Sequence, residues 1–171
     1  KYIVSTYFMN KRLHGLFGLK GEKQVVYDGT TFTVGDPIIM VNNNYALGYL
    51  NGDEGIVSDI VEEENGMMVM MLTMSDGTFH EISGKYMSDV ELAYAITVHK
   101  SQGAECDTAI VLLPATPRNM LERSLIYVGA TRAKRKNIII TENNALERAI
   151  ENTQKKNRFS GLNDQERKIA K

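Results

Sequence analysis

Apolar and polar residues alternate along much of the chain up to residue 90. Two β-rich arms flank Asp28-Gly29 within 24–34, and Asp-Gly between such arms is the commonest signal for a short β-hairpin. Four further β-rich stretches are separated by glycine-containing turns, at 38–41, 55–61, 67–74 and 78–82. Short strands joined by tight turns predict a small barrel of the SH3-like or OB-like kind. Ahead of the hairpin, 9–17 is predicted to be a helix with Leu13, Leu16 and Phe17 on one apolar side, and it follows a short strand end at 2–4.

The hydrophobic pattern changes after Val90. Continuous apolar stretches predict three buried strands, at 92–98, 108–113 and 137–141. A helix is predicted at 119–133, and another is expected from Ala145 onward, followed by a polar tail at 151–171. Continuous apolar strands that alternate with helices are typical of a parallel sheet covered on both faces. The predicted fold class is therefore α/β, with a parallel sheet and helices built from the two ends of the chain and interrupted by an inserted small β-barrel.

The composition excludes several classes of protein. Of the 171 residues, 43% are hydrophobic and 24% are charged, and no apolar run approaches the roughly 18 residues that a membrane span needs. A single cysteine, Cys106, and three histidines exclude an internal disulfide framework and predict no metal site. With a net charge of -1, any contact with nucleic acid needs a local basic patch. No secretory leader follows Lys1, and a chain that starts without Met is expected to be a fragment, here of a cytoplasmic protein.

A polar segment overlaps the end of the predicted strand at 92–98 and extends beyond it. It runs through 97–105 and contains hydroxyls, an imidazole, an ammonium and an amide, which are suited to binding the phosphates of a nucleotide or a nucleic acid. Ligands of open α/β sheets bind at the carboxyl ends of the strands, so this segment is a candidate site. From the residues alone, the alternative is a solvated loop in which Thr97 or Ser101 caps a helix.

A second candidate is Arg132, at the end of the second predicted helix. Lys134, Arg135 and Lys136 follow it and are expected to form an exposed basic turn that opposes the helix dipole. Arg132 precedes the small Ala133 within the helical segment, where its guanidinium would be held rigidly toward a neighbouring domain. A rigid, always charged, forked donor is what a phosphoryl group in transfer needs from an arginine finger. A purely structural role at the helix end is the alternative.

Two runs of residues, in this order, resemble helicase motifs. The run Ala-Ile-Thr-Val-His-Lys-Ser-Gln-Gly-Ala-Glu at 95–105 resembles motif V of superfamily 1 helicases, and Leu-Ile-Tyr-Val-Gly-Ala-Thr-Arg-Ala at 125–133 resembles their motif VI. Upstream, 34–45 and 51–55 are similar to the segment that leads into the SH3-like insertion of RecD-type helicases. The resemblance covers residues 10–142. It identifies the chain with the C-terminal region of the RecD-like, or exodeoxyribonuclease V alpha subunit, family: a second RecA-like domain with an SH3-like insertion.

The resemblance implies roles for the residues of both motifs. On the DNA side, motif V supplies residues that would contact the backbone of single-stranded DNA, namely Thr97, His99, Lys100 and Ser101. On the nucleotide side, the same motif supplies Gln102, Gly103 and Glu105, of which the acidic residue would approach the ribose. The arginine of motif VI reaches the γ-phosphate across the cleft between two RecA-like domains. Arg132 is therefore the predicted catalytic residue.

The resemblance also implies a division into domains. Residues 1–32 and 91–150 would form the RecA-like domain, 33–90 the inserted barrel and 151–171 the polar tail. The barrel of the family lies against the DNA strand. Here the loops offer amides and aromatic rings that could bond phosphates and stack on bases, from Asn42, Asn43, Asn44, Tyr45 and Tyr49. Asn43 and Tyr45 are the candidate site residues among them. The alternative is that the asparagines at 42–44 form turns and that Tyr45 and Tyr49 pack in the barrel.

The sequence lacks part of an ATPase. No Gly-Lys-Ser/Thr phosphate loop occurs, and no Asp-Glu pair that could hold magnesium follows an apolar strand. ATP and Mg²⁺ would be bound mainly by a first RecA-like domain that this chain lacks, so the chain alone is predicted to be inactive. The predicted function is the C-terminal part of an ATP-dependent DNA helicase that moves on single-stranded DNA. Its expected partners are single-stranded DNA, the missing domain and helicase-nuclease subunits, and no membrane.

The alternative function is a non-enzymatic module that binds single-stranded nucleic acid. Its α/β part would then be a scaffold or a degenerate motor. A phosphate loop upstream in the same reading frame would favour the helicase, and its absence would favour the binding module.

Overall fold

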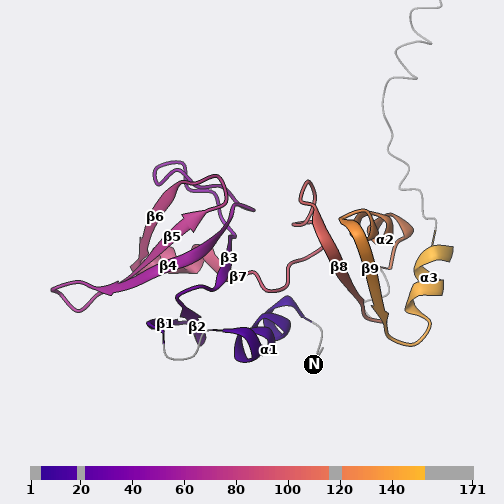
Figure 1. The fold of residues 1–171 in the computed structure, drawn as a ribbon, viewed down its shortest axis with the longest axis horizontal. Coiled ribbons are helices and arrows are strands. Elements are labelled where there is room, and N and C mark those ends of the chain that lie inside the picture. Colours follow the sequence, from indigo (N-terminus) through magenta and orange to yellow (C-terminus); the bar gives the residue numbers. More distant parts are fainter. Residues whose placement is uncertain (1–4, 19–21, 116–120, 153–171) are drawn as a thin grey trace, which may run out of the picture. The chain divides into compact units, whose positions relative to one another are not determined.

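The computed structural model describes residues 5–18, 22–115 and 121–152. The chain divides into two compact units, residues 1–103 and 104–171. The N-terminal unit holds helix α1, a β-hairpin and a five-stranded antiparallel sheet, and the C-terminal unit holds a two-stranded parallel sheet with two helices (Figure 1). The predicted α/β fold class, with a parallel sheet and an inserted antiparallel region, is confirmed.

Helix α1 spans Thr6–Phe17. Its first turn is capped by Ser5, whose hydroxyl accepts a hydrogen bond from Phe8 N at 3.3 Å. The apolar Leu16 near its C-terminal end is exposed, whereas Asn10 is buried. The helix therefore contacts the rest of its unit through a polar side chain where a hydrophobic stripe was expected.

The predicted hairpin is confirmed. Strands β1 (Gln24–Tyr27) and β2 (Thr30–Thr33) pair in antiparallel fashion around Asp28 and Gly29. Both turn residues have positive φ, at 46° and 74°, which matches the twist of the flanking strands and explains why Asp-Gly favours this turn. The strand end predicted at 2–4 lies outside the described residues.

A five-stranded sheet forms where the small barrel was predicted. Its strands are β3 (Pro37–Met40), β4 (Glu54–Glu62), β5 (Met68–Met74), β6 (Phe79–Ser83) and β7 (Val90–Leu92). All neighbours are antiparallel in the order β6-β5-β4-β3-β7, and the 3₁₀ helix η1 (Gly84–Asp89) joins β6 to β7. Met70 and Met74 of the methionine-rich strand are buried, as expected of flexible core filler. The SH3-like identity of this sheet stays a prediction.

The strand predicted at 92–98 is wrong in length and in partner. Strand β7 ends at Leu92 and pairs antiparallel with β3. Beyond it, Ala93 N still donates to Pro37 O, but the backbone of Ala95 binds the side chain of Asn10 instead of a neighbouring strand. The apolar residues that follow Leu92 therefore form a partly buried irregular segment and add no strand to the parallel sheet.

The C-terminal unit is a parallel β-α-β arrangement with a final helix. Its elements are β8 (Cys106–Leu113), α2 (Arg123–Ala130), β9 (Ala133–Thr141) and α3 (Ala145–Glu151). Strands β8 and β9 are parallel, which confirms the expected pairing of the last two predicted strands. Leu113, Leu121, Ala145 and Ala149 form the buried cluster that joins β8 to the helices. In the described part of the chain, no helix is long and apolar enough to cross a membrane.

The helix predicted at 119–133 is shorter than expected. Helix α2 ends at Ala130, so Arg132 lies in the turn between α2 and β9, and its placement inside the helix was wrong. The basic residues 134–136 lie in β9, not in a turn. The physical reason is that the backbone carbonyl of Arg132 accepts from Cys106 N at 3.0 Å, so the ladder between β8 and β9 begins as soon as the helix ends.

The two compact units and the predicted domains have different boundaries. The N-terminal unit combines α1 and the hairpin with the five-stranded sheet and ends at Gly103. The predicted division, with 1–32 and 91–150 in one RecA-like domain, follows the resemblance to the helicase family and stays a prediction.

Candidate functional site

The DNA-side candidates lie in consecutive tight turns after β7. Ser101 N donates to Thr97 O at 3.1 Å, and Lys100 N donates to the Thr97 hydroxyl at 3.3 Å. The Ser101 hydroxyl donates to Val98 O at 2.8 Å. Thr97 thus caps a turn as a helix N-cap would, but no helix follows it. The hydroxyls define the shape of the turn, and the Thr97 hydroxyl keeps a hydrogen that it can donate to a phosphate.

The rest of this segment is open to solvent. His99, Gln102 and Gly103 are exposed. Gly103 adopts φ +90°, a backbone conformation that residues other than glycine rarely adopt. Lys100 Nζ lies 3.7 Å from the carboxylate of Glu91 on β7. This pair is partly exposed, so it restrains the ammonium only weakly.

Arg132 is held by three hydrogen bonds within the C-terminal unit. Its Nε donates to Val128 O at 3.1 Å, and its two terminal nitrogens donate to Ala104 O at 3.1 Å and to the Thr131 hydroxyl at 3.2 Å. The first of these bonds closes the C-terminal turn of α2, where a cation also opposes the helix dipole. The second joins motif VI to the end of motif V. The guanidinium is therefore fixed by the turn between α2 and β9.

The charge of Arg132 has no direct counter-ion in the described residues. All three of its hydrogen-bond partners are neutral oxygens. The nearby Glu105 pairs instead with Lys134, at 2.9 Å. The hydrogen bond and charge of Lys134 hold the pKa of Glu105 below its ordinary value, and the charge of Arg132 adds to this effect. Glu105 is thus ionised near neutral pH while the Arg132 guanidinium remains available to an external anion.

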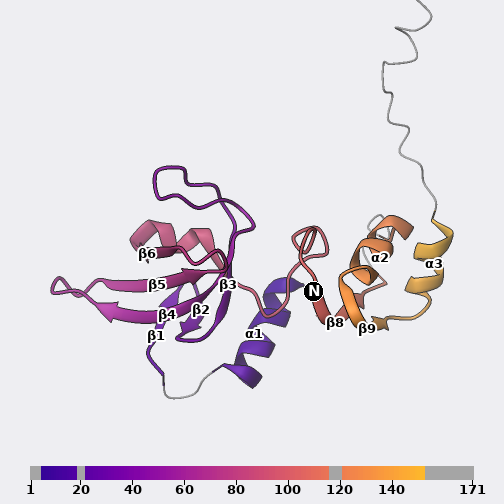
Figure 2. The same ribbon diagram turned by 45° about the horizontal axis from the view of Figure 1, so that its top comes forward.

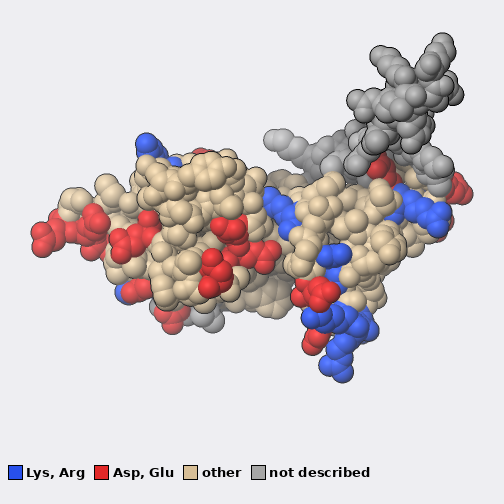
Figure 3. Space-filling view, turned by 90° about the horizontal axis from the view of Figure 1, so that it is seen from above, with Lys and Arg blue, Asp and Glu red and all other residues tan. Residues whose placement is uncertain are grey.

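The C-terminal unit also carries a local group of basic residues, which a protein of low net charge would need for contact with nucleic acid. Lys134, Arg135 and Lys136 are exposed on β9. In the space-filling view, Lys and Arg side chains gather on this unit next to a few acidic ones, and acidic side chains prevail on the visible face of the N-terminal unit (Figure 3). On this face, positive charge is thus more common on the C-terminal unit than on the N-terminal unit.

The structure brings together some of the predicted site residues. Glu105 and Arg132 lie in the same unit and are linked through Ala104 and Lys134. The other motif V candidates, at 97–103, belong to the N-terminal unit and share one set of turns. Motif V therefore begins in one compact unit and ends in the other.

The loop at 41–53 carries the barrel candidates and projects from the sheet between β3 and β4 (Figure 2). The Asn43 side chain accepts from Asn51 N at 2.7 Å, so it shapes the loop, as the alternative reading expected. Tyr45 is 82% exposed and offers a free ring face. Tyr49, by contrast, is fully buried, and the interpretation that its ring is available to stack on a base was wrong.

Tyr49 is part of the core that packs against the five-stranded sheet. Its hydroxyl donates to Asp89 at 2.7 Å and accepts from the Asn44 side chain at 3.2 Å. Burial, together with the hydrogen bond to Asp89, raises the pKa of Tyr49 to about 12. The loop is thus anchored on η1 by one tyrosine and exposes the other.

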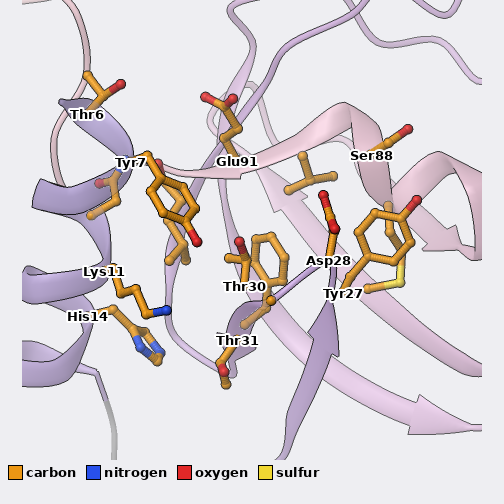
Figure 4. A pocket seen from close by; sticks show the side chains of 16 residues that line it. Thr6, Tyr7, Lys11, His14, Tyr27, Asp28, Thr30, Thr31, Ser88 and Glu91 are labelled. Carbon is orange, nitrogen blue, oxygen red and sulfur yellow. The ribbon is translucent and has the colours of Figure 1, made fainter. Parts of the chain in front are cut away.

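A cavity and a polar network lie next to α1, and neither was predicted from the sequence. A cavity of about 520 Å³ lies between α1, the hairpin and β7, where Tyr7 and Lys11 line it opposite Thr30 (Figure 4). Beside it, Asn10 and His14 make hydrogen bonds to β7 and β2. The only sequence signal for this network is a polar residue, Asn10, in the middle of the predicted helix.

No metal site is evident in the described residues: no group of three or more His, Cys, Asp or Glu side chains is placed to hold a metal ion. The lone Cys106 is exposed and contacts only the carbonyl of Arg132, at 3.7 Å.

Comparison with known sequences places this arrangement in a family. Residues 92–140 match the model of the UvrD-like helicase C-terminal domain. The RecD subunit of the RecBCD enzyme from Mycolicibacterium smegmatis is 38% identical over 118 residues, 69% of this chain and 20% of that protein. The RecD subunit from Buchnera aphidicola is 33% identical over 128 residues, 74% of this chain and 21% of that protein. The ATP-dependent RecD2 DNA helicase of Deinococcus radiodurans is 31% identical over 126 residues, 74% of this chain and 17% of that protein.

Known structures share the fold. The Pif1 helicase from Bacteroides in complex with ADP-AlF3 and single-stranded DNA has a TM-score of 0.54 and 20% identity, covering 95% of this chain and 42% of that chain. A structure of two coordinating Pif1 helicases at forked double-stranded DNA has a TM-score of 0.58 and 18% identity, covering 95% of this chain and 41% of that chain. At these identities the likeness concerns the fold alone.

Fold, motif geometry and matches together define the class as the C-terminal region of a superfamily 1 helicase. Within that class the chain belongs to the RecD-like family, because RecD proteins match it over 69% to 76% of its length. It spans about a fifth of the length of these curated relatives.

Proposed function

We propose that this chain is the C-terminal part of an ATP-dependent helicase that translocates on single-stranded DNA, and that Arg132 is its arginine finger. The observation that carries this proposal is the state of the guanidinium. Three neutral oxygens hold it in place, and the nearest carboxylate, that of Glu105, is paired with Lys134. A fixed, unpaired positive charge is what stabilises the negative charge of a phosphoryl group in transfer.

The nucleotide side of the proposal concerns Gln102, Gly103 and Glu105. The exposed amide of Gln102 and the exposed backbone at Gly103 can donate to a nucleotide, and the ionised Glu105 can accept from ribose hydroxyls. ATP itself would be held mainly by a preceding RecA-like domain. Mg²⁺ would be held there too.

The DNA side combines the turns after β7 with the loop of the barrel. Thr97, His99 and Lys100 present hydroxyl, imidazole and ammonium groups suited to phosphate oxygens, and Ser101, whose hydroxyl donates to Val98 O, holds these turns in shape at the proposed site. Tyr45 offers an exposed ring on which a base can stack, and Asn43 keeps its amide hydrogens for a phosphate. In this proposal 33–90 is an SH3-like barrel inserted into a RecA-like domain formed by 1–32 and 91–150.

Partners of the full-length protein follow from the relatives. Several relatives bear the name RecBCD enzyme subunit RecD, which supports helicase-nuclease subunits as partners. The RecD2 helicase of Deinococcus radiodurans bears a name that mentions no other subunit, so the full-length protein acting alone is the second possibility. Co-purification of the full-length protein with nuclease subunits would decide between them.

Replacing Arg132 in the full-length protein tests the proposal. Arg132→Ala is expected to lower the rate of ATP hydrolysis by roughly 10³-fold or more and to leave the affinity for single-stranded DNA in the absence of nucleotide largely unchanged, because the finger contacts the γ-phosphate and not the strand. Arg132→Lys should recover little, since an ammonium cannot make the same forked contacts. Turnover is measured with saturating ATP and DNA.

Lys136→Ala is the matched control. It removes an exposed cation of β9 but leaves the hydrogen bonds of Arg132 and the pair between Glu105 and Lys134 in place, so near-normal turnover is expected. Undiminished hydrolysis by Arg132→Ala would reject the finger. Absence of hydrolysis in the unmodified full-length protein would favour a non-enzymatic module that binds single strands.

A further inference from the structure

Asn10 is buried in the middle of α1, and its side chain makes hydrogen bonds to a stretch of backbone that lies far away in the sequence. Its side-chain nitrogen donates to Leu92 O at 2.6 Å and to Ala95 O at 3.0 Å. Its side-chain oxygen accepts from Ala95 N at 2.7 Å. The residue is only 7% exposed. One amide group therefore satisfies three backbone groups that no strand pairs.

Only an amide side chain can do this in such a small space. It supplies two donor hydrogens and an acceptor on one planar group, whereas a carboxylate or a hydroxyl lacks part of this set. Buried backbone groups left without a partner are costly, so the bonds of Asn10 replace the strand partner that residues after Leu92 lack. They fix the chain at the point where β7 ends.

A second set of bonds fixes the same stretch from the side of the barrel. The fully buried carboxylate of Asp36 accepts from the Tyr94 hydroxyl at 2.7 Å and from Thr33 N at 2.7 Å. His14 lies one helical turn after Asn10, and its Nε2 is 3.1 Å from the same carboxylate. Asp36 thus positions Tyr94 while Asn10 positions the residues on either side of it.

The positioned stretch leads directly into the DNA-side turns. Thr97 follows Ala95 by two residues, and its backbone and hydroxyl form the first hydrogen bonds of those turns. A shift of Ala95 is therefore carried to Thr97 and Lys100 through a very short piece of chain. By contrast, nothing else in the described residues bonds the backbone of Ala95.

We propose that Asn10 is a positioning residue for DNA binding: it holds the start of motif V so that the turns at 97–101 present their phosphate-binding groups in one fixed arrangement. The effect on DNA binding rests on the proposed function. The positioning of the backbone at 92–95 by Asn10 does not. Asn10 touches neither DNA nor nucleotide in this account and acts through the backbone of Leu92 and Ala95.

The test uses the full-length protein with Asn10→Ala and Asn10→Leu. The leucine keeps the volume of the side chain and the helix, so a folded protein is expected even if the alanine variant is too unstable to study. Two quantities are measured: amide hydrogen exchange across 93–103 without ligands, and DNA-stimulated ATP hydrolysis as a function of the concentration of single-stranded DNA. Exchange is expected to accelerate about tenfold or more in this segment alone.

The kinetic expectation separates positioning from general damage. The DNA concentration for half-maximal stimulation should rise about tenfold, while turnover at saturating DNA falls much less. Val25→Ala is the control, because Val25 is buried in the hairpin side of the same unit and has no bond to motif V. It should lower the melting temperature without changing the DNA dependence.

Each outcome decides a different point. Unchanged exchange at 93–103 in both variants would overturn the inference whether or not the protein is a helicase. Faster exchange with an unchanged DNA dependence would overturn the role in DNA binding. If the unmodified protein shows no DNA-stimulated hydrolysis, the proposed function fails; the affinity for a labelled single strand then replaces the kinetic measurement, and an unchanged affinity would likewise reject the inference.

Discussion

At the scale of single residues, Arg132 combines an observed structural role with the proposed chemical one. One guanidinium closes the end of α2 through Val128 O and joins motif VI to Ala104. Its residue type and motif could be recognised from the sequence. The lack of a counter-ion for Arg132 among the described residues could not be predicted from the sequence. It depends on the ion pair between Glu105 and Lys134, which forms only in the folded chain.

Asn10 shows the limit of prediction from residues more clearly. Its partners lie 82 and 85 residues further along the chain, and hydrophobic periodicity carries no information about a bond over that distance. The apolar residues of α1 suggested the inner face of the helix, yet Leu16 is 73% exposed and Asn10 is buried. A polar anchor of this kind is visible only in the folded structure.

Tyr49 gives a prediction about alkaline pH. Its pKa is raised from an ordinary value near 10 to about 12, so the folded state holds the phenol proton more tightly than the unfolded state. The resulting stability is complete below pH 10 and is lost as the pH rises from 10 through 12. Tyr49→Phe should therefore be less stable than the unmodified chain at pH 9, by on the order of 2 kcal/mol.

The difference between the two proteins should shrink as the pH approaches 12, because the phenylalanine variant has no phenol to ionise. Urea denaturation of both proteins at several pH values measures it. A stability difference that stays constant or grows between pH 10 and 12 would show that the folded state does not raise the pKa of Tyr49.

At the scale of elements, the close approach of β4 and β5 depends on a glycine. A Cβ at Gly55 would lie 2.6 Å from Thr73 O and 3.0 Å from Met74 Cα, both of them backbone atoms that cannot rotate away. Gly55→Ala should therefore separate the two strands and destabilise the N-terminal unit by about 1–3 kcal/mol. Thermal unfolding of the purified chain measures this loss.

Gly15→Ala is the opposite case and serves as the control. Gly15 lies inside α1 with nothing within 4 Å of its missing Cβ. Alanine should stabilise the helix by about 0.5–1 kcal/mol, because it loses less backbone entropy on folding than glycine. Equal effects of the two substitutions would mean that the contact at Gly55 does not limit the approach of the strands.

Elements defined by local signals were predictable, and those defined by distant partners were not. The hairpin at 24–33 needs only a turn whose residues accept positive φ, and the parallel pair β8 and β9 follows from two long apolar runs. The run at 92–98 looks the same in sequence but receives its hydrogen bonds from a side chain on α1. The same holds for the end of α2, where pairing with β8 begins earlier than helix propensity suggests.

At the scale of the whole molecule, motif V connects two compact units. Its DNA-side turns at 97–101, together with Gln102 and Gly103, lie in the unit of the five-stranded sheet, and Ala104 and Glu105 lie in the unit of Arg132. A continuous chain of few residues thus links the proposed grip on DNA to the proposed contact with nucleotide. Such a link is what a motor needs in order to change its hold on DNA with the state of the nucleotide.

The RecD relatives are much longer than this chain. The chain covers about a fifth of RecD proteins, so a motor cycle can be observed only in the full-length protein. The proposed roles of the two ends of motif V nevertheless lead to one prediction for that cycle. Nucleotide state and DNA affinity should be coupled, and Arg132 should carry the coupling.

The most direct test is the affinity of the full-length protein for a short single strand, measured with and without a non-hydrolysable ATP analogue. The unmodified protein should change its affinity by about 5- to 150-fold on binding the analogue, whereas Arg132→Ala should bind the strand equally well in both states. An Arg132→Ala variant that still binds the analogue and shows the full change in DNA affinity would contradict the account.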